Sequence, residues 1–549
     1  MDPDLDGDRP VSRPGPALRT LAAVPLAFLG WFFVYPIARI SLLALAPGGR
    51  FDPTPFAEVV TDPGIRSVAF FTLWQAVAST IGTLVLGLPA AYVFARYRFP
   101  GRRLLRALMT VPFVLPTLVV ASAFVALVGP GGLLGVDLQG TVAAILLAHV
   151  FYNVPIVIRG VGAFWEQVDP AVGDAARTLG ASPVRAFRTV TLPLLVPALA
   201  STAALVFLFT FTSFGVILVL GGFEHATIEV EIWRQTVAFL RLDVAAALSL
   251  TQLGFLAVVL AGYNRLQARR AVVLPQRPGS RHLRTPRGAR DLGAVAGILG
   301  VTAAFLLGPL VVLVRRALLT PTGFGLDNFV ALTERTTALF VPPVEAISNS
   351  LRFAAAATVL AVLVGVTAAV VVARDRGALG RGLDLLLMLP LAASAVTIGF
   401  GLLVSMDRPV DLRRSTLLLP IAHALVAVPF VVRAALPAMR AIGGRLREAA
   451  AVLGASPWRA WRTVEAPLAA RALAVGTAFA FAVSLGEFGA TAFLARPAAP
   501  TLPIAIFRLL GQPGRGTIGP AMALSVVLLV LTVAAIAAIE TLRVGGDEL

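Results

Sequence analysis

The chain has 549 residues, of which 58% are hydrophobic and only 14% are charged, and its mean hydropathy is +0.86. Soluble domains are about 45–50% apolar and about 25% charged, so this composition excludes a soluble protein and indicates many membrane crossings. The sequence has a formal charge of +17 but contains no lysine and no cysteine, which excludes disulfides, thiolate metal sites and the lysine-dependent phosphate loop of ATPases.

Twelve apolar stretches are long enough to cross about 30 Å of hydrocarbon. They lie near residues 21–45, 67–95, 104–128, 140–162, 192–220, 243–263, 292–314, 349–373, 383–405, 416–436, 466–495 and 519–540. The first stretch follows charged residues and lacks a small-residue cleavage pattern, so we expect an uncleaved helix. The sequence therefore predicts an all-α membrane protein with about twelve transmembrane helices.

The loops between these stretches predict the orientation of the chain. Arginines gather after the second and fourth stretches and in residues 264–291, whereas 46–66 and 221–243 are acid-rich or mixed. Cytoplasmic loops carry excess arginine, so both termini, including a tail at 1–20, are expected in the cytoplasm. The same distribution explains the positive charge without a nucleic-acid partner. The Pro-, Gly- and Arg-rich segment 264–291 is predicted to be a flexible linker between two domains.

The two predicted domains, residues 21–263 and 292–549, repeat one another. Ala148-His149, Val154-Pro155, Arg159, Leu179-Gly180-Ala181-Ser182-Pro183 and Phe214-Gly215 recur at a constant displacement of 274 positions, as Ala422-His423, Val428-Pro429, Arg433, Leu453-Gly454-Ala455-Ser456-Pro457 and Phe488-Gly489. A fixed displacement over many residues indicates an internal repeat. Each domain is therefore one six-helix unit, and the even helix number gives both units the same orientation.

The segment after the fourth stretch of each unit predicts two short helices and a sharp turn. Asp169-Pro170 has the pattern of a helix N-cap and first residue, and Ser182-Pro183 repeats it. Gly180 is suited to the left-handed conformation that ends a helix. We call this compact segment, which runs from Asp169 to Pro193 in the first half, the knuckle. Its alanines give it a smooth face and its arginines a basic rim, and Pro193 is expected to mark the return to the membrane.

Both copies of this segment resemble the E-A-A-x3-G-x9-I-x-L-P loop of permease subunits of binding-protein-dependent ABC importers. The matching residues are Asp174, Ala175, Ala176, Gly180, Arg185, Arg188 and Pro193 in the first copy, and Glu448, Ala449, Ala450, Gly454, Arg459, Arg462 and Pro467 in the second. Asp174 replaces the glutamate, Val190 and Val464 replace the isoleucine, and Ala466 replaces the leucine. The resemblance implies the type I importer permease fold in the bacterial inner membrane, and loops that couple the chain to an ATPase.

The same resemblance implies partners for a chain that is not itself an enzyme. These are two copies of a cytoplasmic ATP-binding subunit, which would hold the ATP and magnesium, an extracytoplasmic substrate-binding protein and membrane lipid. This chain itself is expected to bind no cofactor and no metal. The fused twelve-helix form is similar to the thiamine and ferric-iron importer group. The run His149-Val150-Phe151-Tyr152-Asn153-Val154-Pro155 favours thiamine, with ferric iron as the alternative.

Four residues are candidates for the substrate pathway: Glu487, Ser213, Phe214 and Phe488. Glu487 is the carboxylate placed well inside a predicted span, toward its outer side, where it would meet a cationic cargo or fix helix packing. His149 and His423 are expected to be hydrogen-bonded within the bundle, and Trp233 and Phe507 to be interfacial anchors.

A secondary transporter built from parallel six-helix repeats is the alternative from another class. Arg374-Asp375-Arg376 with Gly380-Arg381 faintly resembles a basic loop of such carriers. Paired coupling loops, however, have no role in them. A membrane enzyme is disfavoured because no metal-ligand cluster or nucleophile–base pair stands out.

Overall fold

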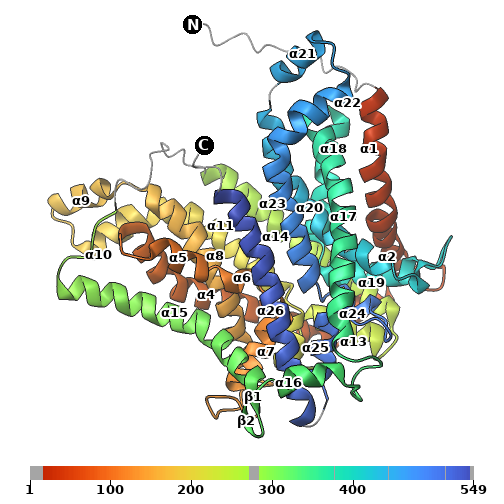
Figure 1. The fold of residues 1–549 in the computed structure, drawn as a ribbon, viewed down its shortest axis with the longest axis horizontal. Helices are drawn as coiled ribbons and strands as arrows, with labels where there is room; N and C mark the ends of the chain where they lie inside the picture. Colours follow the sequence, from red (N-terminus) through yellow and green to blue (C-terminus); the bar gives the residue numbers. More distant parts are fainter. Residues whose placement is uncertain (1–15, 271–282, 376, 443, 513–514, 545–549) are drawn as a thin grey trace.

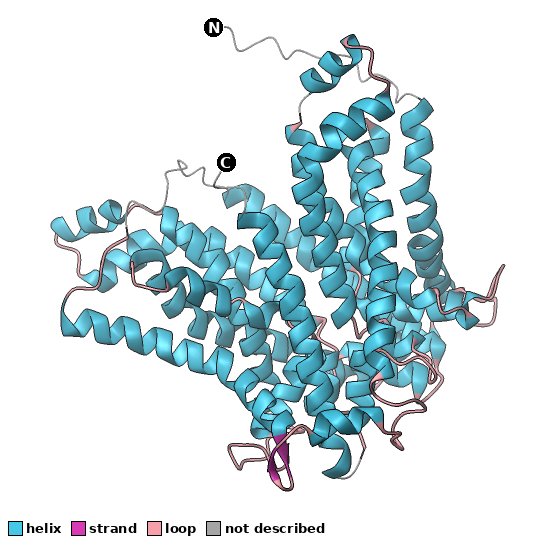
Figure 2. Cartoon of the chain, in the orientation of Figure 1, coloured by secondary structure: helices cyan, strands magenta, loops and turns pink. Residues whose placement is uncertain are grey.

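The computed structural model describes residues 16–270, 283–375, 377–442, 444–512 and 515–544. These residues are almost entirely helical (Figure 2), and the named strands are the short hairpin of β1 (Leu319–Thr320) and β2 (Gly323–Phe324). The predicted all-α class is therefore confirmed over the described part of the chain.

The first half runs from α1 to α14. Its elements are α1 (Pro16–Leu29), α2 (Tyr35–Leu45), α3 (Thr54–Thr61), α4 (Pro63–Arg96), α5 (Arg102–Leu108), α6 (Val111–Val114), α7 (Thr117–Val128), α8 (Val142–Gln167), α9 (Pro170–Thr178), α10 (Pro183–Ala186), α11 (Leu192–Phe211), α12 (Gly215–Leu220), α13 (Ile228–Val237) and α14 (Leu242–Arg270).

The second half runs from α15 to α26. Its helices are α15 (Gly288–Leu318), α16 (Asp327–Val330), α17 (Glu345–Arg374), α18 (Ala378–Ala392), α19 (Ala395–Ser405), α20 (Leu418–Ala441), α21 (Gly444–Val452), α22 (Pro457–Ala460), α23 (Ala466–Gly486), α24 (Thr491–Leu494), α25 (Leu502–Leu510) and α26 (Arg515–Val544).

Ten helices among the described residues are long and apolar enough to cross a membrane, and two bent pairs bring the number to as many as 12. The pairs bend by 101° at 102–128 and by 99° at 378–405, where the sequence predicted spans at 104–128 and 383–405. In the first pair Pro116 follows α6 and cannot donate the backbone hydrogen bond that would continue the helix. In the second, Ser394 caps α19 by accepting from the Thr397 backbone N at 3.0 Å.

The halves are joined by an exchange of their first helices. Helix α1 packs against α17 and α2 against α19 of the second half, while α15 packs against α4 and α7 of the first. Figure 1 shows the exchange in colour, with red α1 beside the blue-green helices and green α15 beside the orange ones. Each half therefore packs its first helices against the body of the other half.

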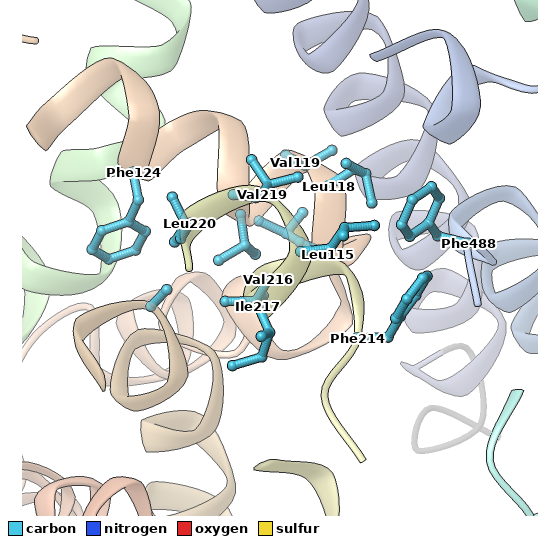
Figure 3. Packing of buried hydrophobic residues seen from close by; sticks show 14 of the residues in the cluster. Leu115, Leu118, Val119, Phe124, Phe214, Val216, Ile217, Val219, Leu220 and Phe488 are labelled. Carbon is cyan, nitrogen blue, oxygen red and sulfur yellow. The ribbon is translucent and has the colours of Figure 1, made fainter. Parts of the chain in front are cut away.

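The halves diverge toward the ends that carry α9 and α21 and meet at the opposite end, where α7, α13, α24 and α25 lie (Figure 1). At the meeting end, α7 and α12 form an apolar cluster that reaches Phe488 of the second half (Figure 3). A polar contact joins the halves nearby, since the Ser525 hydroxyl lies 2.8 Å from that of Ser122.

The repeat predicted at 274 positions extends with a displacement of 278 through the second and third spans. Thr72 and Ser350 are related by this displacement and make equivalent hydrogen bonds. The Thr72 hydroxyl accepts from the Ile228 backbone N at 3.0 Å. The Ser350 hydroxyl accepts from the backbone N of Leu502, the counterpart of Ile228 by the displacement of 274, at 2.7 Å. The change of displacement reflects a loop four residues shorter between the third and fourth spans of the second half.

The structure describes both ends of the segment predicted to link the halves. Helix α14 continues to Arg270, and α15 begins at Gly288. The Arg284 backbone exchanges hydrogen bonds with Arg96 and Arg98 at 3.0 and 2.9 Å, and its guanidinium donates to the Tyr97 hydroxyl at 2.7 Å. Arg277 and Arg281, which contributed to the linker prediction, lie outside the described residues.

Candidate functional site

The first predicted knuckle forms with the caps that the sequence indicated. The Asp169 carboxylate accepts from the Ala171 backbone N at 2.9 Å at the start of α9. The Ser182 hydroxyl accepts from the Arg185 backbone N at 3.3 Å at the start of α10. Between them Gly180 has a φ of +90°, a conformation that side chains with a Cβ rarely adopt. The predicted caps and turn are confirmed.

The second knuckle repeats this local geometry. Gly454 has a φ of +80° between α21 and α22, and the Ser456 hydroxyl accepts from the Arg459 backbone N at 3.3 Å. Because nothing lies within 4 Å of a Cβ placed on either glycine, the requirement for glycine comes from backbone conformation alone.

Pro193, which was expected to mark the return to the membrane, and its counterpart Pro467 lie at the second positions of α11 and α23. The chain passes through π-helical segments at Phe187–Thr191 and Trp461–Glu465 directly into α11 and α23. A proline ring clashes with the carbonyl four residues earlier, and the wider π turn relieves that clash. The second short helix of each knuckle is therefore continuous with a membrane helix.

Each knuckle exposes an apolar side chain beside its basic rim. Leu179 and Leu453 are 89% and 87% exposed, and Val184 and Trp458 are also exposed at matched positions. Arg185, Arg188 and Arg459 are exposed around them. Paired apolar tips of this kind, rimmed by charge, are typical of surfaces that dock another protein. They lie at the diverging ends of the two halves (Figure 1).

The candidate pathway residues occupy matched breaks in the fifth span of each half. Helix α11 ends at Phe211 and α12 begins at Gly215, so Ser213 and Phe214 lie between them. Helix α23 ends at Gly486 and α24 begins at Thr491, so Glu487 and Phe488 lie in the equivalent gap. The predicted continuous spans 192–220 and 466–495 are therefore interrupted.

Histidines hold both breaks, which confirms the expectation that they are hydrogen-bonded within the bundle. His149 Nε2 lies 2.8 Å from the Ser213 hydroxyl, and its Nδ1 lies 3.1 Å from the Ser79 hydroxyl of α4. His423 Nδ1 and Nε2 each lie 2.8 Å from a hydroxyl, those of Ser484 and Thr491. All ring nitrogens are thereby satisfied, as buried polar groups require.

Glu487 is buried at the second break, and the side chain's acceptor oxygens are engaged by its neighbours. The carboxylate accepts from the backbone N–H groups of Ala490 and Thr491 at 2.8 and 3.0 Å and from the Thr491 hydroxyl at 2.7 Å. One carboxylate oxygen also lies 3.3 Å from His423 Nε2. These contacts cap α24 and fix the break in the fifth span.

Two aromatic pairs meet across the halves, and the members of each are related by the displacement of 274. The Phe214 and Phe488 rings stack with centroids 5.3 Å apart and planes at 23°, as Figure 3 shows. Trp233 and Phe507 meet edge to face at 6.4 Å, where the sequence had suggested separate interfacial anchors. Repeat-related residues that touch one another lie on the axis relating the halves. The pairs therefore close that axis at the meeting end of the molecule.

Two buried carboxylates were missed because residues 221–243 were expected to be an outside loop. They lie on α13, where Glu229 accepts from Gln252 at 2.5 Å and Glu231 pairs with Arg234 at 2.6 Å. Both are 0% exposed. The run from Ile228 to Ile232 alternates apolar and acidic residues, which gives no helical periodicity by which the buried helix could be recognised.

Among the described residues, no group of three or more histidine, aspartate or glutamate side chains is arranged to hold a metal ion. The polar groups at the breaks are instead held by hydrogen bonds between helices. The arrangement places exposed apolar tips at one end and closed aromatic contacts at the other.

Comparison with known proteins identifies similar chains. Residues 83–270 match the family described as "Binding-protein-dependent transport system inner membrane component". The thiamine transport system permease protein of Brucella suis biovar 1 (strain 1330) is 30% identical over 529 residues, covering 90% of this chain and 92% of that protein. The protein of the same description from Salmonella typhimurium (strain LT2) is 29% identical over 512 residues, with coverages of 90% and 92%. The sulfate transport system permease protein CysT of the same Salmonella strain is 37% identical over 172 residues, 30% of this chain and 62% of that protein.

Proposed function

Because the chain belongs to the binding-protein-dependent inner membrane components of ABC importers, as a permease with both halves fused, we propose that it imports thiamine with energy from a separate ATPase. The observation that carries the cargo proposal is the likeness to thiamine permeases along 90% of the chain. The sulfate permease is similar over 30% of it. The family is a membrane permease and not an enzyme, so ATP and magnesium belong to the proposed partner.

The two knuckles are the proposed contact with that partner. Each presents an exposed leucine at its turn, and each is continuous with a membrane helix through its π segment. A displacement of the knuckle by an ATPase subunit would therefore move α11 or α23 as a lever. We propose two ATPase copies, one for each knuckle, on the cytoplasmic side of the membrane, where both chain termini are also expected to lie.

The aromatic pairs are the proposed outer closure of the pathway. With the knuckles apart and the opposite ends joined, the described arrangement is the inward-facing one of an alternating-access cycle. When the substrate-binding protein delivers cargo, the Phe214–Phe488 stack has to separate. Thiamine carries a fixed positive charge on an aromatic ring, so the exposed faces of these rings would suit it.

In this proposal Glu487 fixes the break in the fifth span, and the rings of Phe214 and Phe488, not the carboxylate, contact the cargo. Its oxygens are engaged by Ala490, Thr491 and His423. The break that it fixes holds Phe488 on the axis.

The test of this function is purification of the chain with its neighbouring ATPase and measurement of ATP hydrolysis with the cognate binding protein. Thiamine-loaded binding protein is expected to stimulate hydrolysis, whereas the same protein offered ferric iron or sulfate is not. Stimulation by ferric iron alone would make ferric iron the cargo in place of thiamine. Failure of the ATPase to associate with the chain would overturn the proposed coupling role of the knuckles.

A further inference from the structure

A crevice of about 610 Å³ lies between the two halves, on the side of the knuckles. The first half contributes residues of α5, α6 and α8, and the second half contributes Val533, Ile536 and Ala537 of α26. The volume is that of a site for a drug-sized molecule. It is separate from the aromatic closure, the breaks in the fifth spans and the knuckles.

The crevice is basic at one side. Arg103, Arg106 and Arg159 line it, and of these only Arg106 forms an ion pair among the described residues, with Glu166. That carboxylate is shared with Arg102. The lining of the crevice therefore holds three arginines and no acidic side chain. An excess of cationic side chains beside a cavity favours an anionic ligand.

The rest of the crevice is almost entirely apolar. Apart from the three arginines, the residues that line the crevice are Thr110 and a set of alanine, leucine, valine and isoleucine side chains. Arg159 lies eight residues before the knuckle-side end of α8, so it is about 12 Å from that end along the helix. Val533 lies six residues before the end of the candidate span Gly516–Ile539, about 9 Å along α26. The basic groups thus lie at the depth of one lipid leaflet's polar boundary, and the apolar wall continues beside the hydrocarbon.

We propose that this crevice binds the headgroup phosphate of an anionic phospholipid, with its acyl chains along α6 and α26. A water-soluble phosphate compound shares the headgroup chemistry but has no use for the apolar wall. Basic pockets between membrane helices are known to hold such headgroups. The inference goes beyond the transport function and does not depend on which cargo is carried.

The repeat supports a dedicated site because the second half lacks the full cluster. By the displacement of 278, Arg103 corresponds to Arg381, but Arg106 corresponds to the acidic Asp384. By the displacement of 274, Arg159 corresponds to Arg433. General attraction of arginine to the cytoplasmic side would have filled both halves alike. The full cluster of three arginines is therefore found in the first half alone, while α26 of the second half supplies the facing wall of the crevice.

The test is lipid binding to the purified full chain in detergent, with dioctanoyl phosphatidylglycerol as the probe and dioctanoyl phosphatidylcholine as its zwitterionic comparison. Native mass spectrometry counts the bound lipid across a titration. Arg103→Gln/Arg159→Gln is expected to raise the Kd for phosphatidylglycerol at least about tenfold, since each arginine near a headgroup contributes substantially. The matched control Arg381→Gln/Arg433→Gln removes the same charge from the other half and is expected to leave that Kd within about twofold.

Two further measurements test the apolar wall independently of the arginine variant. Ala537→Trp fills the apolar wall without changing charge, and it is expected to weaken phosphatidylglycerol binding to a similar degree. Glycerol phosphate, a soluble phosphate without acyl chains, is expected to bind at least about tenfold more weakly than the lipid, because it buries no hydrocarbon. Equal binding of glycerol phosphate would reassign the crevice to a soluble phosphate compound. An equal loss of lipid in the control variant would overturn the site.

Discussion

Removing the first-half members of the two aromatic pairs is expected to open the outer closure. Phe214 and Trp233 each contact their repeat-related partner in the other half, at centroid distances of 5.3 and 6.4 Å. An aromatic pair contributes about 0.5–1.5 kcal/mol beyond the burial of its area. Phe214→Ala/Trp233→Ala therefore removes about 1–3 kcal/mol from the inward-facing state, which is about 5–150-fold in its population relative to the outward-open state.

The assay is ATP hydrolysis by the reconstituted complex without binding protein, together with leak of labelled thiamine from loaded liposomes. Both are expected to rise about 5–150-fold, and Phe214→Ala alone is expected to give a smaller rise, since the Trp233–Phe507 pair remains. Phe209→Ala is the matched control. Its ring lies on α11, just before the break that holds Phe214, but packs against Phe113 of its own half at 5.8 Å. A rise as large in Phe209→Ala, or none in the double variant, would refute the closure on the axis.

Three further predictions concern the knuckles, the second break and the topology. Gly180→Val and Gly454→Val force a β-branched residue into φ values of +90° and +80°, which costs about 1–2 kcal/mol of backbone strain each. Both variants are expected to weaken co-purification of the ATPase. Gly49→Val introduces a similar strain at a φ of +77° in another loop and is expected to leave co-purification unchanged. Glu487→Gln places an amide NH2 among the donors of Ala490 and Thr491 and is expected to lower stability by about 1–3 kcal/mol, seen as a lower Tm. Glu224→Gln, at an exposed position, is expected to keep the wild-type Tm, and an unchanged Tm in Glu487→Gln would remove its positioning role. Reporters fused after Arg270 are expected on the cytoplasmic side and those after Gly222 on the outside, and the opposite pattern would reverse the placement of the knuckles.

The sequence predicted the features that depend on local chemistry. The caps at Asp169 and Ser182 and the positive φ at Gly180 follow from residue types at fixed spacing, and the structure has all three. The six-helix repeat was equally visible, because apolar length and matched motifs survive without any knowledge of packing.

Features that depend on contacts between distant segments could not be predicted. Hydropathy reads 104–128 as one apolar stretch, so it does not register the bend before Thr117. Nor does it show that α1 and α15 exchange between the halves, since both are ordinary apolar helices. The stacking of Phe214 on Phe488 was hidden for a related reason: a shared displacement identifies equivalent residues but does not indicate whether they touch.

The buried acids show the limit of reasoning from charge. Glu487 stood out because it lay in an apolar stretch, and a cationic cargo offered it a partner. The structure supplies partners from the chain itself, in the backbone of α24 and in His423. Glu229 and Glu231 drew no attention in a polar segment, although the fold buries them completely.

Uptake of labelled thiamine into proteoliposomes that contain the chain, its ATPase and its loaded binding protein distinguishes an ATP-driven importer from a secondary transporter. Accumulation is expected when ATP is present, and none is expected when ATP is replaced by ADP or when only a proton or sodium gradient is applied. Accumulation driven by an ion gradient without ATP would contradict the importer function and would place the chain among secondary transporters.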